Sequence, residues 1–182
     1  APRASWARYI FGVCREMIKR GVEVKGFNTA FAGDVPLGAG MSSSAALESA
    51  YAYAINDLFG DNKIDKFELA KVGQATEHNY IGVKCGIMDQ FASVFGKEGS
   101  LMRLDCRSLE YQYFPFKPEG YRLVLVDSVV KHELASSAYN KRRESCENVV
   151  KAIAKKHEGV EFLRDCTLEM LAEVKAEVSE ED

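Results

Sequence analysis

The sequence lacks several features that each define a class of protein. It has no apolar run of the roughly eighteen residues that a membrane-spanning helix requires, and charged residues interrupt its first twenty positions, so neither a membrane span nor a signal peptide is expected. Its five cysteines are an odd number without a Cys-x-x-Cys pair, which argues against a disulfide framework and a zinc site. These absences predict a soluble protein of the reducing cytoplasm.

A strong charge of either sign is also missing. The formal net charge is −3 and the basic residues are scattered, so no surface for nucleic acid or anionic membrane is predicted, and a small-molecule ligand is the better expectation. With 47% hydrophobic residues in 182, the chain has the composition of a globular protein of one domain or slightly more. It starts at Ala1 without an initiator methionine and directly in a helical pattern, so we expect a piece of something longer. Separately, we expect a monomer.

Hydrophobic periodicity predicts a mixture of helices and strands. Helical spacing followed by a glycine favours a helix at residues 5–20, and further helices are expected at 42–59, 65–80 and 136–157. Runs of β-branched and aromatic residues predict strands at 24–35 and 121–127, a strand meander at 93–116 and a loop at 81–89. The fold class is therefore α+β, with a new layer beginning near Pro118.

The most informative segment is PLGAGMSSSAAL at residues 36–47, between a predicted strand and a predicted helix. Gly38 and Gly40 allow backbone angles closed to other residues, and the free N–H groups of the helix they precede attract phosphate. Three serines add hydroxyl groups. A glycine turn with a serine helix cap is the alternative, favoured for a bare Gly-x-Gly but not for the whole segment. No lysine follows as in Walker A, and the third glycine of the dinucleotide fingerprint is absent.

This segment resembles the second motif of the GHMP small-molecule kinases, with Met41 in place of the usual leucine. Downstream, CGIMDQF at residues 85–91 resembles the galactokinase branch of that family more closely than the mevalonate or homoserine kinases, and the similarity extends through 100–110 and 132–147. The resemblance implies a two-domain α+β GHMP kinase fold. Residues 1–117 would belong to the ribosomal-protein-like N-terminal domain, and 118–182 would begin the ferredoxin-like C-terminal domain.

The resemblance also implies a reaction, the transfer of phosphate from ATP, with Mg²⁺, to the anomeric hydroxyl of galactose. Asp89 matches the base or orienting carboxylate, Gly86 a backbone position against the sugar, and Tyr139 a tyrosine near that carboxylate. A helix-capping role is the alternative for Asp89, and a half-buried helix tyrosine for Tyr139. The family segment with the arginine partner of the aspartate and the third, glycine-rich motif are not in this chain, so we expect impaired activity of the piece itself.

Nucleotide and metal positions follow from the same resemblance. Glu77 matches a glutamate that holds Mg²⁺ together with the serine corresponding to Ser44, an oxygen pair suited to that cation. Trp6 and Tyr9 match aromatic residues near the adenine, although core packing of an amphipathic helix is the stronger reading from the residues alone. The phosphates are assigned to Gly38, Gly40, Ser42, Ser43 and Ser44. No chemistry is assigned to the three histidines or to Cys85.

Three alternatives stay open at this point. The first is a kinase for another sugar, such as N-acetylgalactosamine or arabinose. The second is a non-catalytic sensor of galactose and ATP, which the complete Ser42 to Ala46 stretch disfavours because sensors of that type have a shortened one. The third is an isolated fragment without activity.

Overall fold

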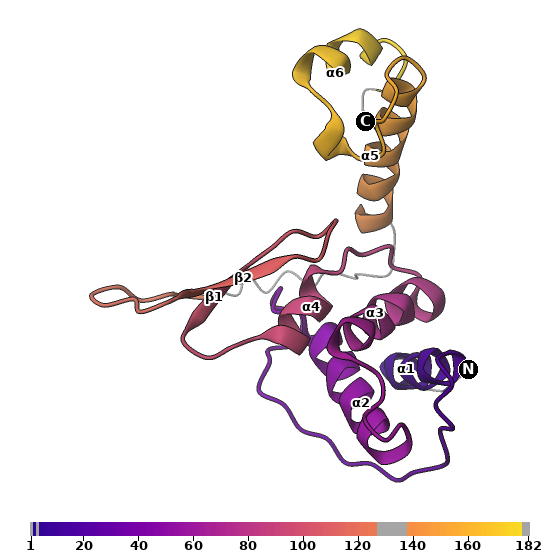
Figure 1. Ribbon diagram of the computed structural model, residues 1–182, viewed down its shortest axis with the longest axis vertical. Helices are drawn as coiled ribbons and strands as arrows, with labels where there is room; N and C mark the ends of the chain where they lie inside the picture. Colours follow the sequence, from indigo (N-terminus) through magenta and orange to yellow (C-terminus); the bar gives the residue numbers. More distant parts are fainter. Residues whose placement is uncertain (1, 3, 127–137, 180–182) are drawn as a thin grey trace. The chain divides into compact units, whose positions relative to one another are not determined.

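The computed structural model describes residue 2 and residues 4–126 and 138–179, in two units, Ala1–His132 and Glu133–Asp182 (Figure 1). Each unit has its own buried core. The sequence-based boundary at residue 118 stays a prediction. No helix within these described residues is both long enough and apolar enough to cross a bilayer.

Four helices form the body of the first unit: α1 (Ala7–Lys19), α2 (Ser43–Phe59), α3 (Lys66–Thr76) and α4 (Met88–Phe95). The first three lie against one another in Figure 1 because each turns an apolar stripe inward. Asp65 caps α3 by accepting a hydrogen bond from the Glu68 backbone N–H at 2.9 Å. The shared core consists of Val13, Met17, Val22, Tyr51, Ala52, Ile55, Leu69 and Val72.

Strands β1 (Ser100–Leu104) and β2 (Tyr111–Pro115) form an antiparallel hairpin in which Met102 lies opposite Tyr113. The hairpin packs on α4 through aromatic rings: Phe91 stacks on Phe95 with ring centroids 4.2 Å apart, and Tyr111 contacts both. This second core fixes the orientation of α4, whose first turn contains Asp89.

The second unit is helical in its described part. It contains α5 (Ala138–Ala154), the 3₁₀ turn η2 (Leu163–Asp165) and α6 (Leu168–Val174), which begins where the Thr167 hydroxyl accepts from the Met170 N–H. Its core is Val149, Ala152, Ile153 and Val174.

The helix predictions for 5–20, 42–59 and 65–80 are confirmed within a few residues, although the last ends in a π-helix, η1 (Glu77–Ile81). The prediction for 136–157 corresponds to α5, with 136–137 outside the described residues. Within 93–116 the expected meander is a single hairpin.

The strand predictions for 24–35 and for the described part of 121–127 are wrong. Neither segment is a strand, and Val124 is 78% exposed. Apolar β-branched residues form a strand only beside a hydrogen-bonded neighbour, and the one ladder in the described chain is β1 with β2. Residue 127 lies outside the described residues.

Candidate functional site

The glycine–serine loop leads directly into the N-terminus of α2. Gly38 and Gly40 both have φ of 73°, in the left-handed region that glycine adopts without strain. Ser42, the N-cap residue, also has a positive φ, and its side chain makes no capping hydrogen bond. The N–H groups of the first turn of α2 therefore have no serine cap at this position, and the loop before them is exposed.

Ser44 and Glu77 meet although they are far apart in the sequence. The Ser44 hydroxyl, in the first turn of α2, lies near enough to the Glu77 carboxyl of η1 to act on it as a hydrogen-bond donor. Burial raises the pKa of Glu77 above its ordinary value and the nearby charge of Asp89 adds to the rise, whereas the bond from Ser44 acts to lower it. The structure thus brings together two of the predicted metal and phosphate residues.

Glu77 lies where α3 passes into the π-helix η1, and its own N–H still bonds to the Gly73 carbonyl as in an α-helix. The Glu77 carbonyl accepts hydrogen bonds from the backbone N–H groups of Gly82 at 2.8 Å and Val83 at 3.0 Å, and Gly82 closes the turn with φ of 90°. Single π-turns within helices occur frequently at functional sites. Glu77 is the first residue of this turn and only 6% exposed.

Asp89 lies in the first turn of α4 and is exposed. Its charge acts on Glu77, so the two carboxyl groups share one electrostatic environment. Gly86, three residues earlier, is exposed, and no atom lies within 4 Å of the place where a β-carbon would be.

The sequence analysis missed two buried residues near this site, Glu48 and Gln90. Glu48 is fully buried on α2, and its Oε2 accepts a hydrogen bond of 3.3 Å from Nε2 of Gln90, which is also buried. Gly73 of α3 gives them room, since a β-carbon there would lie 2.7 Å from Gln90 Cγ. Their spacing in the sequence could have indicated them. Glu48 follows Ser44 by four residues, on the same helix face, and Gln90 directly follows Asp89.

Burial raises the pKa of Glu48 to about 9, with a smaller contribution from the charge of Glu77. The same two carboxyl groups, after burial, help to raise the pKa of Tyr9 and of Cys85 to about 12 each. The charges of these acidic groups therefore reach Tyr9. Cys85 is a thiol near neutral pH, which disfavours it as a nucleophile.

Trp6, which was predicted to lie near the adenine, has another aromatic ring as its neighbour. Trp6 is the N-cap residue of α1, about half exposed, and meets Phe31 edge to face with ring centroids 5.6 Å apart. The Phe31 ring in turn meets the Tyr51 ring edge to face, with ring centroids 5.8 Å apart. This accessible aromatic surface is chemically suited to a flat ring, and the adenine assignment stays a prediction.

Tyr139, predicted to lie near Asp89, is on the first turn of α5 in the second unit, and its role stays a prediction. In the part of the chain that the structure describes, no three His, Cys, Asp or Glu side chains gather as a metal site. The Ser44 and Glu77 pair offers two oxygen ligands, which suits a cation that takes its remaining ligands from phosphates and water.

Comparison with known proteins agrees with this geometry. Residues 8–97 match the family described as "GHMP kinases N terminal domain". The chain is 52% identical over 151 residues to a galactokinase of Thermotoga maritima, covering 83% of this chain and 43% of that protein. It is 40% identical over 170 residues to a galactokinase of Clostridium tetani, covering 93% and 43%.

A solved structure is similar as well. The Lactococcus lactis galactokinase complexed with galactose superposes with a TM-score of 0.76 at 29% identity, over 94% of this chain and 43% of that one. The α+β fold class is therefore confirmed. The chain spans less than half the length of the relatives that it matches.

Proposed function

We propose that this chain, which belongs to the GHMP kinase family, carries part of the active site of a galactokinase. The whole protein would transfer the γ-phosphoryl group of ATP to the anomeric hydroxyl of galactose. The observation that carries the proposal is the proximity of Ser44 to Glu77 in the electrostatic neighbourhood of Asp89. These residues come from α2, η1 and α4, and only the fold brings them together.

The N-terminus of α2 is the proposed phosphate site. Its free N–H groups and positive dipole end attract anions, and the open glycine loop allows the main chain to approach them closely. Gly38, Gly40, Ser42 and Ser43 would contact the phosphates in this arrangement. Trp6 at the start of α1 would lie against the adenine.

Ser44 and Glu77 would hold Mg²⁺. A hydroxyl and a carboxylate are hard oxygen ligands, and here they are close neighbours, so the residues fit this cation. When bound, Mg²⁺ supplies positive charge that offsets the charge of the transferring phosphate. Binding of a cation here would also favour ionised Glu77, which burial alone disfavours.

Asp89 would orient the sugar hydroxyl and accept its proton. Phosphoryl transfer requires mainly positioning and charge stabilisation from the protein, and an exposed carboxylate fixed at a helix N-terminus suits that task. Gly86 would lie against the sugar, and the role of Tyr139 is carried over from the resemblance alone. The assignment of residues 1–117 and 118–182 to two domains, a cytoplasmic location and a monomeric state belong to the same proposal.

A sugar panel tests the proposal. ADP release by the whole protein with MgATP is measured with galactose, N-acetylgalactosamine, arabinose and no sugar. We expect turnover that depends on galactose. Turnover with N-acetylgalactosamine or arabinose and none with galactose would reassign the sugar, and binding of galactose and ATP without turnover would favour the sensor.

A further inference from the structure

One face of α1 lies against the π-helix that carries Glu77. Arg8, Gly12 and Glu16 are spaced four apart, so they line one side of the helix. Arg8 Nη2 donates to the Tyr80 carbonyl, Gly12 lies against Thr76 and Tyr80, and Glu16 Oε1 accepts from Asn79 Nδ2 at 3.0 Å. All three contacts fall on the segment 76–80, which spans the start and middle of η1.

We propose that Arg8, Gly12 and Glu16 form a clamp, called here the α1 clamp, that positions η1 and thereby the carboxyl group of Glu77. They are positioning residues, since none of them contacts a reacting group. The role of Glu77 as a magnesium ligand rests on the proposed function, whereas the clamp itself does not.

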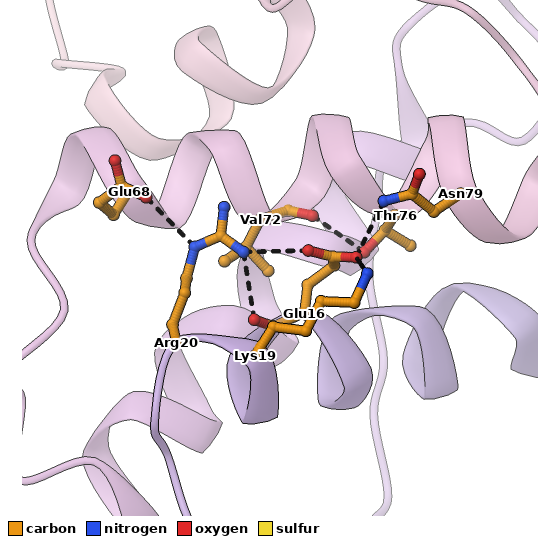
Figure 2. Close-up of polar contacts among 7 residues, drawn as sticks. All are labelled: Glu16, Lys19, Arg20, Glu68, Val72, Thr76 and Asn79. Carbon is orange, nitrogen blue, oxygen red and sulfur yellow. Dashed lines mark hydrogen bonds and ion pairs between the residues drawn. The ribbon is translucent and has the colours of Figure 1, made fainter.

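Glu16 anchors the clamp because several side chains donate hydrogen bonds to it. Its side chain is buried, and besides Asn79 it accepts hydrogen bonds from Lys19 Nζ at 2.7 Å and Arg20 Nη1 at 3.0 Å (Figure 2). Arg20 also bonds Glu68 at 3.2 Å, which ties the cluster to the first turn of α3. Burial acts to raise the pKa of Glu16, yet the bonds from Lys19, Asn79 and Arg20 hold it below its ordinary value, so it is a charged and strong acceptor.

Gly12 sets the distance between the two elements. A β-carbon at this position would lie 2.5 Å from Thr76 Cγ2 and 3.1 Å from Tyr80 Cδ2, so any larger residue would push η1 away. Thr76 is fully buried, and its hydroxyl donates to the Val72 carbonyl at 2.9 Å, a bond that bends helices (Figure 2). The π-turn begins at the next residue.

A π-turn benefits from such outside support. Its hydrogen-bond pattern is rare, so neighbouring contacts decide whether a segment adopts it instead of continuing as an α-helix. The contacts with α1 at Thr76, Asn79 and Tyr80 flank Glu77 on both sides, so loosening them would allow the Glu77 carboxyl to move relative to Ser44. The clamp therefore stabilises the position of Glu77 beside Ser44.

Hydrogen exchange of the whole protein, measured by mass spectrometry, tests the clamp directly. Asn79→Asp places a carboxylate against Glu16, and Asn62→Asp is a matched control because Asn62 donates to Asp57 Oδ1 at 2.8 Å on the surface. In Asn79→Asp we expect exchange at the Gly82 and Val83 amides to rise about tenfold, since a bond to a charged group is lost, while α2 stays unchanged. Asn62→Asp should leave 82–83 at the wild-type rate.

A rescue variant separates positioning from general damage. Adding Glu16→Gln to Asn79→Asp recreates an amide–carboxylate bond in the opposite sense, so exchange at 82–83 should return to within about threefold of wild type. In the kinase assay, Asn79→Asp should raise the Mg²⁺ concentration for half-maximal rate with the KM for galactose unchanged. Unchanged exchange at 82–83 in Asn79→Asp, or an equal rise in Asn62→Asp, would overturn the clamp, and neither result depends on kinase activity.

Discussion

Replacing Glu48 by glutamine would remove a titratable group from the middle of α2 while keeping its shape. Within the described residues, Glu48 Oε1 and Gln90 Oε1 are both buried without a hydrogen-bond partner, whereas Glu48 Oε2 accepts from Gln90 Nε2. A protonated carboxyl has the donor that the Gln90 carbonyl lacks, and burial raises the pKa of Glu48 to about 9. A glutamine at position 48 offers an N–H donor in the same place, so the variant should fold.

The size of the expected pH effect follows from the single proton that Glu48 holds in the folded protein. The folded-state pKa of about 9 lies above the ordinary 4.5, so the folded protein holds a proton that the unfolded chain releases. The stabilisation from Glu48 is therefore fully present below about pH 4.5 and is lost as the pH rises through about 9. One proton gives a slope of about 1.4 kcal/mol per pH unit, hence at most about 2.7 kcal/mol between about pH 6 and pH 8.

Urea unfolding followed by circular dichroism at several pH values measures this difference. The free energy of unfolding of Glu48→Gln should fall less steeply with pH than that of wild type. In the control Glu98→Gln, which changes an exposed glutamate, the free energy of unfolding should vary with pH as it does in wild type. A Glu48→Gln curve parallel to wild type from about pH 6 to pH 8 would mean that Glu48 is ionised in the folded protein, and the reasoning would be refuted.

Three further substitutions test the catalytic residue, the metal site and the packing of the core. Asp89→Asn should lower kcat by about a hundredfold or more, with MgATP binding retained in a thermal-shift titration; near-normal kcat would favour a helix-capping role. Ser44→Ala removes a proposed metal ligand and the donor to Glu77, so the Mg²⁺ concentration for half-maximal rate should rise about tenfold, and an unchanged requirement would exclude Ser44 as a ligand. Phe91→Ala should cost about 3–5 kcal/mol in urea unfolding because Phe91 is fully buried against Phe95, and a loss below about 1 kcal/mol would contradict that packing.

The helices of the first unit were largely predictable. The apolar stripe of α1 is a local pattern, and the structure reproduces it. Helix α4 was missed because its eight residues are too short for periodicity to separate from a loop. The π-turn η1 was missed because it depends on contacts with Gly12 and Glu16, which are distant in sequence.

The strand predictions failed for a related reason. Residues 24–35 and 121–126 have strand-like composition, but a strand also needs a neighbour, and composition carries no information about it. In the candidate site, the loop and the CGIMDQF segment were readable because their residue types and spacing are unusual. Glu48 was not, since a glutamate on a helix is usually exposed and only the fold buries this one.

The most direct test of the shared site is a crystal structure of the whole protein with galactose and a non-hydrolysable ATP analogue with Mg²⁺. We predict a metal ion about 2.1 Å from the Ser44 hydroxyl and a Glu77 carboxylate oxygen. The Asp89 carboxylate should lie about 2.6–3.2 Å from the anomeric hydroxyl of galactose. A metal ion held away from Ser44 and Glu77, or a sugar bound out of reach of Asp89, would contradict the account.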